Sequence, residues 1–378
     1  MTVGAKHQVI DSDAHVEEWA DTFAERHLDP AYARRRPAIV GAGSRAYWLI
    51  DDRVLPMMVG PGCHILGTPT GHGQGDSEYT KVKAKLRLDD VDSMELHPVE
   101  ARLHSMDNEA IDLQVIYPTL FLVYPLTYDA GFYAALCRSY NNWMADVTHG
   151  QERLKWVATV DLGNVDLAIG ELKRVRDLGA LAVMLHGMYN TRQLHDPAFE
   201  PFFAEAERLR LPVAIHVGWP CPPMTQLFST IWESLLIPFT VPVFMAFSSF
   251  IGGGVLDRHP NLKVGFFETG VGWLPYWLER MEHFWKFGEM KLAIGYRGER
   301  PPIEYLQSGN LFFNCETDEQ LVPQVVDLIG EDHLLYASDM PHGDRTPHNA
   351  KQFWDRNDLS EAVKAKILSA NSLRFYGL

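Results

Sequence analysis

Short apolar runs recur along the chain, each four to eight residues long and bounded by glycine, proline or polar residues. Runs of this length are typical of parallel strands that are covered on both faces. Between them, apolar side chains recur at every third or fourth position, which predicts amphipathic helices. The eight predicted strand regions are 7–15, 113–119, 154–162, 180–187, 211–218, 262–270, 310–316 and 333–342.

Three of the intervening segments carry recognisable helix boundaries. Residues 164–179 repeat apolar positions at helical spacing and end at Gly179, a common stop. The segment 196–210 begins with Asp196 as the expected N-cap, followed by proline in the first turn. Towards the C-terminus, Asp358 and Glu361 have the spacing of a capping box, so we expect a helix to begin there.

Eight strands that alternate with helices predict an α/β fold, a (β/α)8 TIM barrel, as a single domain over residues 1–378. The alternative is a doubly wound open sheet, which would usually carry a glycine-rich phosphate loop after its first strand, where DSDAHVEE stands instead. Two insertions are expected at the C-terminal face of the strands. Residues 41–80 predict a hairpin, turning at 51–53, and a lid; residues 219–250 form an apolar insertion.

Composition narrows the class of protein and of partner. Hydrophobic residues make up 46% of the 378 and charged residues 22%, which excludes a disordered chain. With 34 basic and 49 acidic residues the net charge is −15, so nucleic acid and anionic membranes are not expected partners. The four cysteines form no CxxC pair, and MTVGAKHQVI has no signal-peptide pattern. We therefore expect a cytoplasmic protein without a thiolate zinc site.

One stretch, 234–256, contains no charged residue and is long enough to span a bilayer. Pro238, Pro242 and three successive glycines at 252–254 interrupt it, which favours a soluble protein. Its apolar side chains exceed what a barrel helix facing water needs. We therefore expect part of this segment to lie against another subunit, in a homodimer or a larger oligomer, with a paralogue as an alternative partner.

Residues that bind metals stand at the C-terminal ends of three predicted strands. Asp13 and His15 end the first strand, His216 ends the fifth, and Asp339 follows the eighth. Taken singly, each has an ordinary explanation as a buried histidine or a turn aspartate. Because these strand ends meet at one rim of a barrel, their joint placement favours a mixed nitrogen and oxygen site for a divalent metal.

Several segments together resemble a known family. They are DSDAH, IHVG, HPNLKVGFFETGVGWLPYWLERM (259–281), LLYASDMPHGD (334–344) and the terminal SANSLRFYGL. The chain resembles the amidohydrolase-related family (amidohydrolase 2), which contains aminocarboxymuconate-semialdehyde decarboxylase, resorcylate-type decarboxylases and several hydrolases. The resemblance implies a barrel with a divalent metal held by Asp13, His15, His216 and Asp339. Aspartate in place of the first histidine favours Mn or Fe over Zn.

The resemblance also marks Glu268, which stands where decarboxylase members have a histidine that acts on the metal-bound water. Glu268 is therefore a candidate base, a candidate metal ligand, or a partner of a nearby basic residue. His342 follows Asp339 by three residues and is a further candidate ligand, with a loop hydrogen bond as its alternative. His186 ends the fourth strand, where contact with substrate, support of a ligand and a structural role stay equally open.

These observations predict a metal-dependent enzyme that hydrolyses or decarboxylates a small organic acid or an amide-like substrate, through metal-bound water or a metal-polarised substrate. The proton-handling candidates are Asp339 and Glu268, with His186 as a further catalytic candidate. One alternative is a dinuclear iron or manganese oxygenase on the same barrel, since six candidate ligands are enough for two metals. Another is an inactive partner subunit of an active paralogue.

Overall fold

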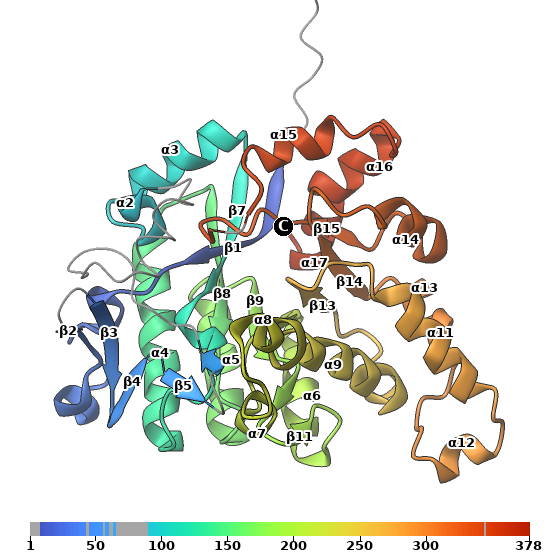
Figure 1. Cartoon of the computed structure of the whole chain (residues 1–378), viewed down its shortest axis with the longest axis horizontal. Helices are drawn as coiled ribbons and strands as arrows, with labels where there is room; N and C mark the ends of the chain where they lie inside the picture. Colours follow the sequence, from blue (N-terminus) through green and yellow to red (C-terminus); the bar gives the residue numbers. More distant parts are fainter. Residues whose placement is uncertain (1–7, 43–44, 56, 60–62, 66–89, 344) are drawn as a thin grey trace, which may run out of the picture.

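Eight parallel strands form one sheet that curls into a nearly closed barrel (Figure 1). The computed structural model describes residues 8–42, 45–55, 57–59, 63–65, 90–343 and 345–378. In sheet order the strands are β1 (Ile10–Val16), β7 (Leu113–Pro118), β8 (Leu154–Thr159), β9 (Ala182–His186), β12 (Val213–His216), β13 (Val264–Phe267), β14 (Leu311–Cys315) and β15 (Leu334–Tyr336). Each lies within or overlaps one predicted strand region, in the predicted order, so the barrel is confirmed.

The first and last parts of the barrel meet through specific hydrogen bonds. The backbone N–H of His15 donates to Met340 O at 2.6 Å, and that of Asp339 donates to Asp13 O at 3.0 Å. Deeper in the barrel, the Ser12 hydroxyl donates to the carbonyl of Tyr336 at 2.6 Å. The segment after β15 therefore lies against β1 and closes the gap that would otherwise expose the edge of the sheet.

Helices surround the barrel, and small strands decorate it (Figure 1). The helices are α2 (Val91–Met94), α3 (Val99–Glu109), α4 (Ala130–Val147), α5 (Val165–Asp177), α6 (Glu200–Leu209), α7 (Pro222–Thr225), α8 (Ile231–Ser234), α9 (Val241–Gly252), α10 (Val255–Arg258), α11 (Leu274–Trp285), α12 (Met290–Ala293), α13 (Pro302–Gln307), α14 (Val322–Ile329), α15 (Asn349–Trp354), α16 (Glu361–Ala365) and α17 (Asn371–Tyr376). The small strands are β2 (Ala38–Ala42), β3 (Arg45–Ile50), β4 (Arg53–Leu55), β5 (Met57–Val59), β6 (Cys63–Ile65), β10 (Met188–Tyr189) and β11 (Arg192–Gln193).

Helix starts follow local side-chain chemistry, with one correction to the prediction. Asp196 accepts a hydrogen bond from Ala198 N at 3.0 Å, as expected of an N-cap. At α16, however, the cap is Ser360, whose hydroxyl accepts from Val363 N at 3.2 Å. The predicted capping box with Asp358 is wrong, because Arg356 holds the Asp358 carboxylate with two hydrogen bonds of 3.0 and 2.8 Å.

The two predicted insertions are partly described. Strands β3 and β4 pair antiparallel around a turn at Asp51 and Asp52, which confirms the predicted hairpin. Residues 60–62 and 66–80 lie outside the described residues, so the lid stays a prediction. The 219–250 insertion folds into α7, α8, a π-helical turn at Leu235–Phe239 and most of α9.

The apolar stretch belongs to the helix layer of the barrel. Among the described residues, Trp232–Gly252 is the helical stretch long and apolar enough to cross a membrane by length and composition, and half of it is buried within the fold. Val243, Phe247 and Phe250 are fully buried in the core of their own chain. These three positions are therefore explained by intramolecular packing, and the expectation that part of 234–256 lies against another subunit stays a prediction.

Candidate metal centre

The candidate ligands converge at the carboxyl end of the barrel. Asp13 and His15 lie on β1, and His216 is the last residue of β12. Glu268 comes directly after β13, and Asp339 comes three residues after β15. Both residues have a left-handed backbone conformation, with φ of 56° and 54°. Residues other than glycine, asparagine and aspartate are rare in this region.

Their side chains form two overlapping groups. Asp13, His15, His216 and Glu268 each offer one ligand atom, and these atoms lie within 4.8 Å of one another. His15, Glu268, Asp339 and His342 form a second such group. His15 and Glu268 belong to both, whereas Asp13 and Asp339, which the sequence placed around one ion, lie in different groups.

Short separations link the members of these groups. His216 Nε2 lies 3.4 Å from Asp13 Oδ1 and 3.4 Å from Glu268 Oε2. His15 Nε2 lies 3.5 Å from the same two oxygens and 3.7 Å from Asp339 Oδ1. Asp339 Oδ1 in turn lies 2.7 Å from His342 Nδ1. Six side chains of types that can bind metal thus surround one small volume.

Backbone carbonyls near Nδ1 orient the rings of His15 and His216. His15 Nδ1 lies 3.1 Å from the carbonyl of Pro118, and His216 Nδ1 lies 3.2 Å from that of Val217. When Nδ1–H donates to these carbonyls, Nε2 of each ring carries a lone pair directed at the carboxylates. His15 Nε2 is buried and makes no hydrogen bond within the described part of the chain. A divalent cation is the partner that this arrangement suits.

Electrostatics lead to the same conclusion. Burial lowers the pKa of His15 well below its ordinary value, with further lowering from the charges of His342 and His216, and burial lowers the pKa of His216 to about 4. Burial also raises the pKa of Asp13 well above its usual range, and the nearby charge of Asp339 raises it further. A divalent cation between these groups favours both, because neutral imidazoles can bind it and its charge offsets the cost of burying the carboxylates.

One supporting residue had not been singled out from the sequence. Asn314, buried in β14, donates from Nδ2 to Asp13 Oδ2 at 2.9 Å. Its Oδ1 accepts from Glu268 N at 2.8 Å. Asn314 therefore orients one candidate ligand and holds the left-handed backbone of another. The available signal was an amide that follows three apolar residues inside the run NLFFNCE.

His186 lies next to the centre but outside both groups of ligands. It ends β9, beside His216 in the sheet, and its ring packs against Gly218. Burial, followed by the charge of His216, lowers the pKa of His186 to about 4, so the ring is neutral at pH 7. Its catalytic role stays a prediction.

A cavity of about 200 Å³ adjoins the centre, and Glu268 and Asp339 form part of its wall. Arg345 also lines it, while its Nη1 lies 3.2 Å from Glu109 Oε1. The remaining lining residues are Leu235, Phe239, Thr240, Glu316, Thr317, Ser338, Thr346 and Asn349. This volume suits a small molecule that reaches the candidate metal ligands.

Fold and site together define a metal-dependent barrel enzyme of the hydrolase and decarboxylase class. Comparison with known families agrees, since the amidohydrolase family model matches residues 10–378. The chain belongs to the amidohydrolase family. A curated relative is the 2-amino-3-carboxymuconate-6-semialdehyde decarboxylase of Dictyostelium discoideum, 27% identical over 79% of this chain and 83% of the relative.

Solved structures share the fold. An amidohydrolase of Mycobacterium avium subsp. paratuberculosis K-10 superposes with a TM-score of 0.77 at 22% identity, over 99% of each chain. The 5-carboxyvanillate decarboxylase of Novosphingobium aromaticivorans, solved with manganese and 4-hydroxy-3-methoxy-5-nitrobenzoic acid, has a TM-score of 0.63 at 23% identity, over 73% of this chain and 79% of its own. The grouped His, Asp and Glu side chains of this chain could hold a divalent metal of the kind bound in that structure.

Proposed function

We propose that this protein is a metal-dependent decarboxylase of a small carboxylic acid, with CO2 as a product. The observation that carries the proposal is the 2.7 Å contact between Asp339 Oδ1 and His342 Nδ1, beside the metal ligands and at the wall of a cavity of about 200 Å³. The contact pairs a carboxyl with an imidazole at the place where substrate would lie. Curated relatives that are decarboxylases of organic acids support this choice over hydrolysis.

Asp13, His15, His216 and Asp339 are the proposed ligands of one metal ion. Two carboxylates and two imidazoles favour Mn²⁺ over Zn²⁺, in line with the manganese bound in the 5-carboxyvanillate decarboxylase structure. When bound, the metal acts as a Lewis acid that orients and polarises substrate oxygen atoms. It also offsets the cost of burying Asp13.

The chain's own residues manage the proton. Protonated Asp339 gives its proton to the unsaturated substrate carbon that bears the carboxylate, and the new C–H bond uses a π electron pair of the substrate. The bond between that carbon and the carboxylate then breaks, its electron pair restores the double bond, and CO2 leaves. His342, held through Nε2 by the Thr119 hydroxyl at 3.2 Å, returns a proton to Asp339 and takes one from water in turn. The sequence balances without an oxidant or a reductant.

The position of Glu268 supports a second candidate arrangement, in which the site holds two metal ions. Glu268 belongs to both ligand groups, so together with His342 it would complete a site for a second ion. Hydrolysis of an amide-like substrate, with Glu268 or Asp339 accepting the proton of water, is the alternative reaction on the same centre. Nothing in the comparisons supports the oxygenase or the inactive-partner interpretation.

The test combines metal analysis with product detection. The protein loaded with Mn²⁺ is offered a panel of hydroxybenzoates and other small carboxylic acids, and CO2 release is followed. Asp339→Asn should retain the fold and lose CO2 release by at least about a hundredfold, the range of a lost acid or base. CO2 release at an unchanged rate in this variant, or release of an amine or alcohol without CO2, would contradict the proposal.

Two further variants test the ligands. His216→Ala should lose bound metal while circular dichroism shows an intact barrel, and full metal occupancy would remove His216 from the ligand set. Glu268→Gln keeps the shape and removes the charge. If Glu268 binds a second ion, the metal-to-protein ratio falls from two to one, whereas a ratio of one in both forms assigns Glu268 to the proton chemistry.

A further inference from the structure

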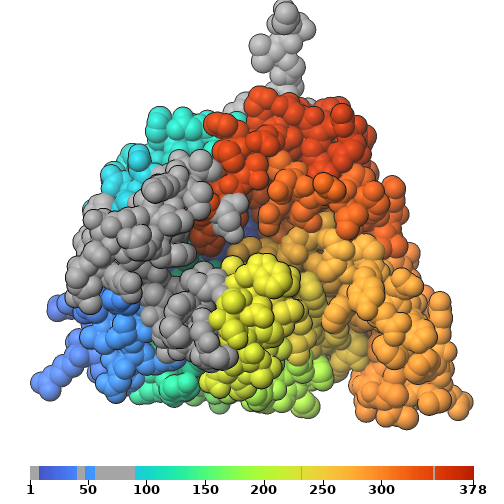
Figure 2. Space-filling model, viewed as in Figure 1, coloured from blue at the N-terminus to red at the C-terminus, as the bar shows by residue number. Residues whose placement is uncertain are grey.

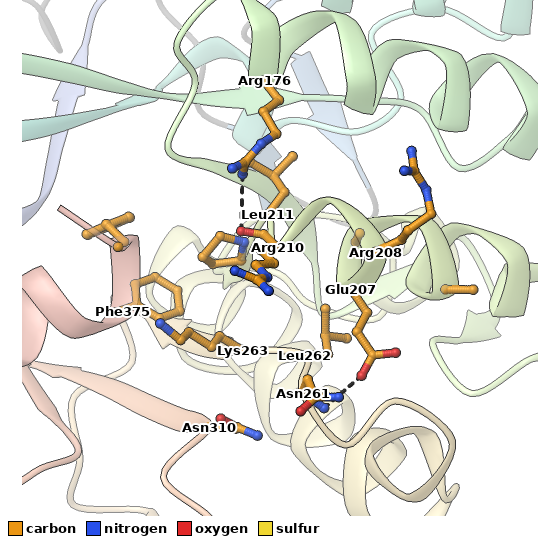
Figure 3. Close-up of a pocket in the computed structure, with 15 residues that line it drawn as sticks. Arg176, Glu207, Arg208, Arg210, Leu211, Asn261, Leu262, Lys263, Asn310 and Phe375 are labelled. Atoms are coloured by element: carbon orange, nitrogen blue, oxygen red, sulfur yellow. Dashed lines mark hydrogen bonds between the residues drawn. The ribbon is translucent and has the colours of Figure 1, made fainter.

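A second cavity, of about 1000 Å³, lies at the amino ends of several barrel strands, and Figure 3 shows the residues that line it. Its walls include Leu211 and Pro212 before β12, Lys263 before β13 and Asn310 before β14. These positions are the amino ends of neighbouring strands, whereas the metal ligands lie at the carboxyl ends. The cavity is therefore separate from the proposed active site.

Charge distinguishes this cavity within an acidic protein. The chain carries a net charge of −15, yet the cavity is lined by four basic side chains and one carboxylate. That carboxylate, Glu207, is already engaged, since its Oε1 accepts from Asn261 N at 2.7 Å and its Oε2 lies 3.5 Å from His259 Nδ1. The local field is positive and attracts an anion.

Three of the basic residues lack a carboxylate partner. Arg176, Arg210 and Lys263 make no ion pair in the described part of the chain; Arg176 Nη1 donates to the carbonyl of Arg210 at 3.3 Å, and Lys263 Nζ donates to the carbonyl of Arg374. Arg208 differs, because Glu205 holds its guanidinium with bonds of 2.6 and 2.7 Å. Figure 3 shows Arg208 extending away from Arg176, Arg210 and Lys263.

Backbone hydrogen bonds anchor the main chain of two lining residues, Lys263 and Asn310. The carbonyl of Lys263 accepts from Val213 N at 3.0 Å, and that of Asn310 accepts from Val264 N at 2.9 Å, both at the ends of barrel strands. Arg210 ends α6 in a left-handed conformation with φ of 51°, where glycine is usual and another residue costs free energy. An arginine kept in a strained position is the kind of feature that accompanies a binding role.

We propose that this basic cavity is a binding site for a small anion of the phosphate type, with Arg176, Arg210 and Lys263 as its cationic partners. Guanidinium groups form paired hydrogen bonds with phosphate oxygens, and an ammonium group adds a further charged donor. A dianion would compensate three cations that the protein itself leaves without a counter-charge. The cavity has room for the organic part of a phosphate ester.

Isothermal titration calorimetry of the full-length, metal-loaded protein tests the proposal, with inorganic phosphate and glycerol 3-phosphate as probes at constant ionic strength. We expect saturable binding of one anion per chain. Lys263→Gln should weaken it by roughly tenfold, the loss expected for one charged hydrogen bond. Arg208→Gln, a change of equal charge in the same wall, should leave the dissociation constant unchanged.

Arg210→Gly separates binding from folding. Glycine suits the left-handed position, so this variant should melt at the same temperature as the wild type or higher, yet bind the anion roughly tenfold more weakly. Tighter binding of the ester than of phosphate identifies an organic phosphate as the ligand, and equal binding identifies free phosphate. Binding that does not saturate, that survives Lys263→Gln and Arg210→Gly, or that is lost in His216→Ala overturns the proposal.

Discussion

Glu268 and Asp339 reach the metal centre because their backbones adopt a conformation that costs free energy. Each is held there by one hydrogen bond from its own N–H, to Asn314 Oδ1 for Glu268 and to Asp13 O for Asp339. A conventional extended backbone would send each side chain elsewhere. The geometry of the centre therefore depends on neighbours that do not themselves bind metal.

Asn314 is the clearest of these neighbours. Replacing it with alanine removes the hydrogen bond to Asp13 and leaves the part-buried N–H of Glu268 without its acceptor. We expect metal affinity to fall by about 10–100-fold, the usual cost of losing a group that orients a ligand. Titration of the metal-free protein with Mn²⁺, followed by electron paramagnetic resonance, measures this change.

Asn141 provides a matched control for that experiment. It is also a buried asparagine that bridges two backbone groups, the N–H and the carbonyl of Thr159, each at 3.0 Å. Asn141→Ala should cost a similar free energy of unfolding, about 1–3 kcal/mol, and should leave Mn²⁺ affinity unchanged. Equal loss of affinity in both variants would show that Asn314 acts through general stability.

Glu18 predicts a pH dependence of stability. Burial raises the pKa of its carboxyl from 4.5 to about 8, against lowering by hydrogen bonds from Leu120 N and Thr119 N. Between these pH values the folded chain holds a proton that the unfolded chain releases. This residue's contribution to stability is therefore complete below pH of about 4.5 and is lost as the pH rises towards 8, by up to about 1.4 kcal/mol per pH unit.

Glu18→Gln keeps an acceptor for Leu120 N and cannot ionise. Its melting temperature should fall less than that of the wild type between pH of about 5 and about 8. Glu100→Gln removes an exposed carboxylate on α3 and should leave the wild-type slope. Parallel melting curves for Glu18→Gln and wild type across this range would contradict a raised pKa.

Among the elements, β9 and α9 approach each other more closely than a side chain allows. A Cβ added to Gly187, just after β9, would lie 1.9 Å from the carbonyl oxygen of Pro242 in the first turn of α9. Because backbone atoms cannot give way as a flexible side chain does, Gly187→Ala should displace α9 and cost about 1–3 kcal/mol of unfolding free energy. Denaturant unfolding measures the loss.

Gly170 offers the opposite case in a helix. It lies inside α5 with open space around its position, so Gly170→Ala should raise the unfolding free energy by about 0.5–1 kcal/mol. If Gly187→Ala also proves neutral or stabilising, the close approach of β9 and α9 is not a constraint on the fold.

Strands and helix starts could be predicted from the sequence where a single local pattern determines them. Apolar runs located all eight barrel strands, and Asp196 marked its helix start. Competition between two neighbours for one side chain was harder to predict. Asp358 has the spacing of an N-cap, but its carboxylate binds Arg356 instead. At the centre, charged and imidazole side chains at strand ends signalled a metal site. Asn314 was missed because a neutral amide gives no such signal and its partner Asp13 is 301 positions away.

At the scale of the whole molecule, the surface keeps an apolar patch around α8. Trp232 is 71% exposed and Leu236 52% exposed, next to residues that pack into the core. Figure 2 shows this yellow segment standing out on the face of the molecule. Apolar side chains gathered on a surface are typical of an interface with another subunit. The basis for predicting an oligomer therefore lies in this patch, not in the buried phenylalanines of α9.

We expect the protein to form a dimer or a larger oligomer at micromolar concentration, and Trp232→Glu to shift it towards monomer. Light scattering coupled to size exclusion measures the mass. Leu167→Glu, at a single exposed leucine of α5, is the control and should not change it. A monodisperse monomer in the wild type would sink the idea.

The closure of the barrel between its first and last strands also determines when the candidate metal site can form during translation. Asp11 on β1 and Ser338 after β15 are joined by a hydrogen bond across 327 positions, and Asp339 is fastened to Asp13 beside them. A ribosome needs on the order of half a minute to make that much chain. Until then the nascent polypeptide has Asp13, His15 and His216 without the closing segment that seals them. The proposed metal ligands therefore reach their final geometry only after nearly the whole chain has emerged.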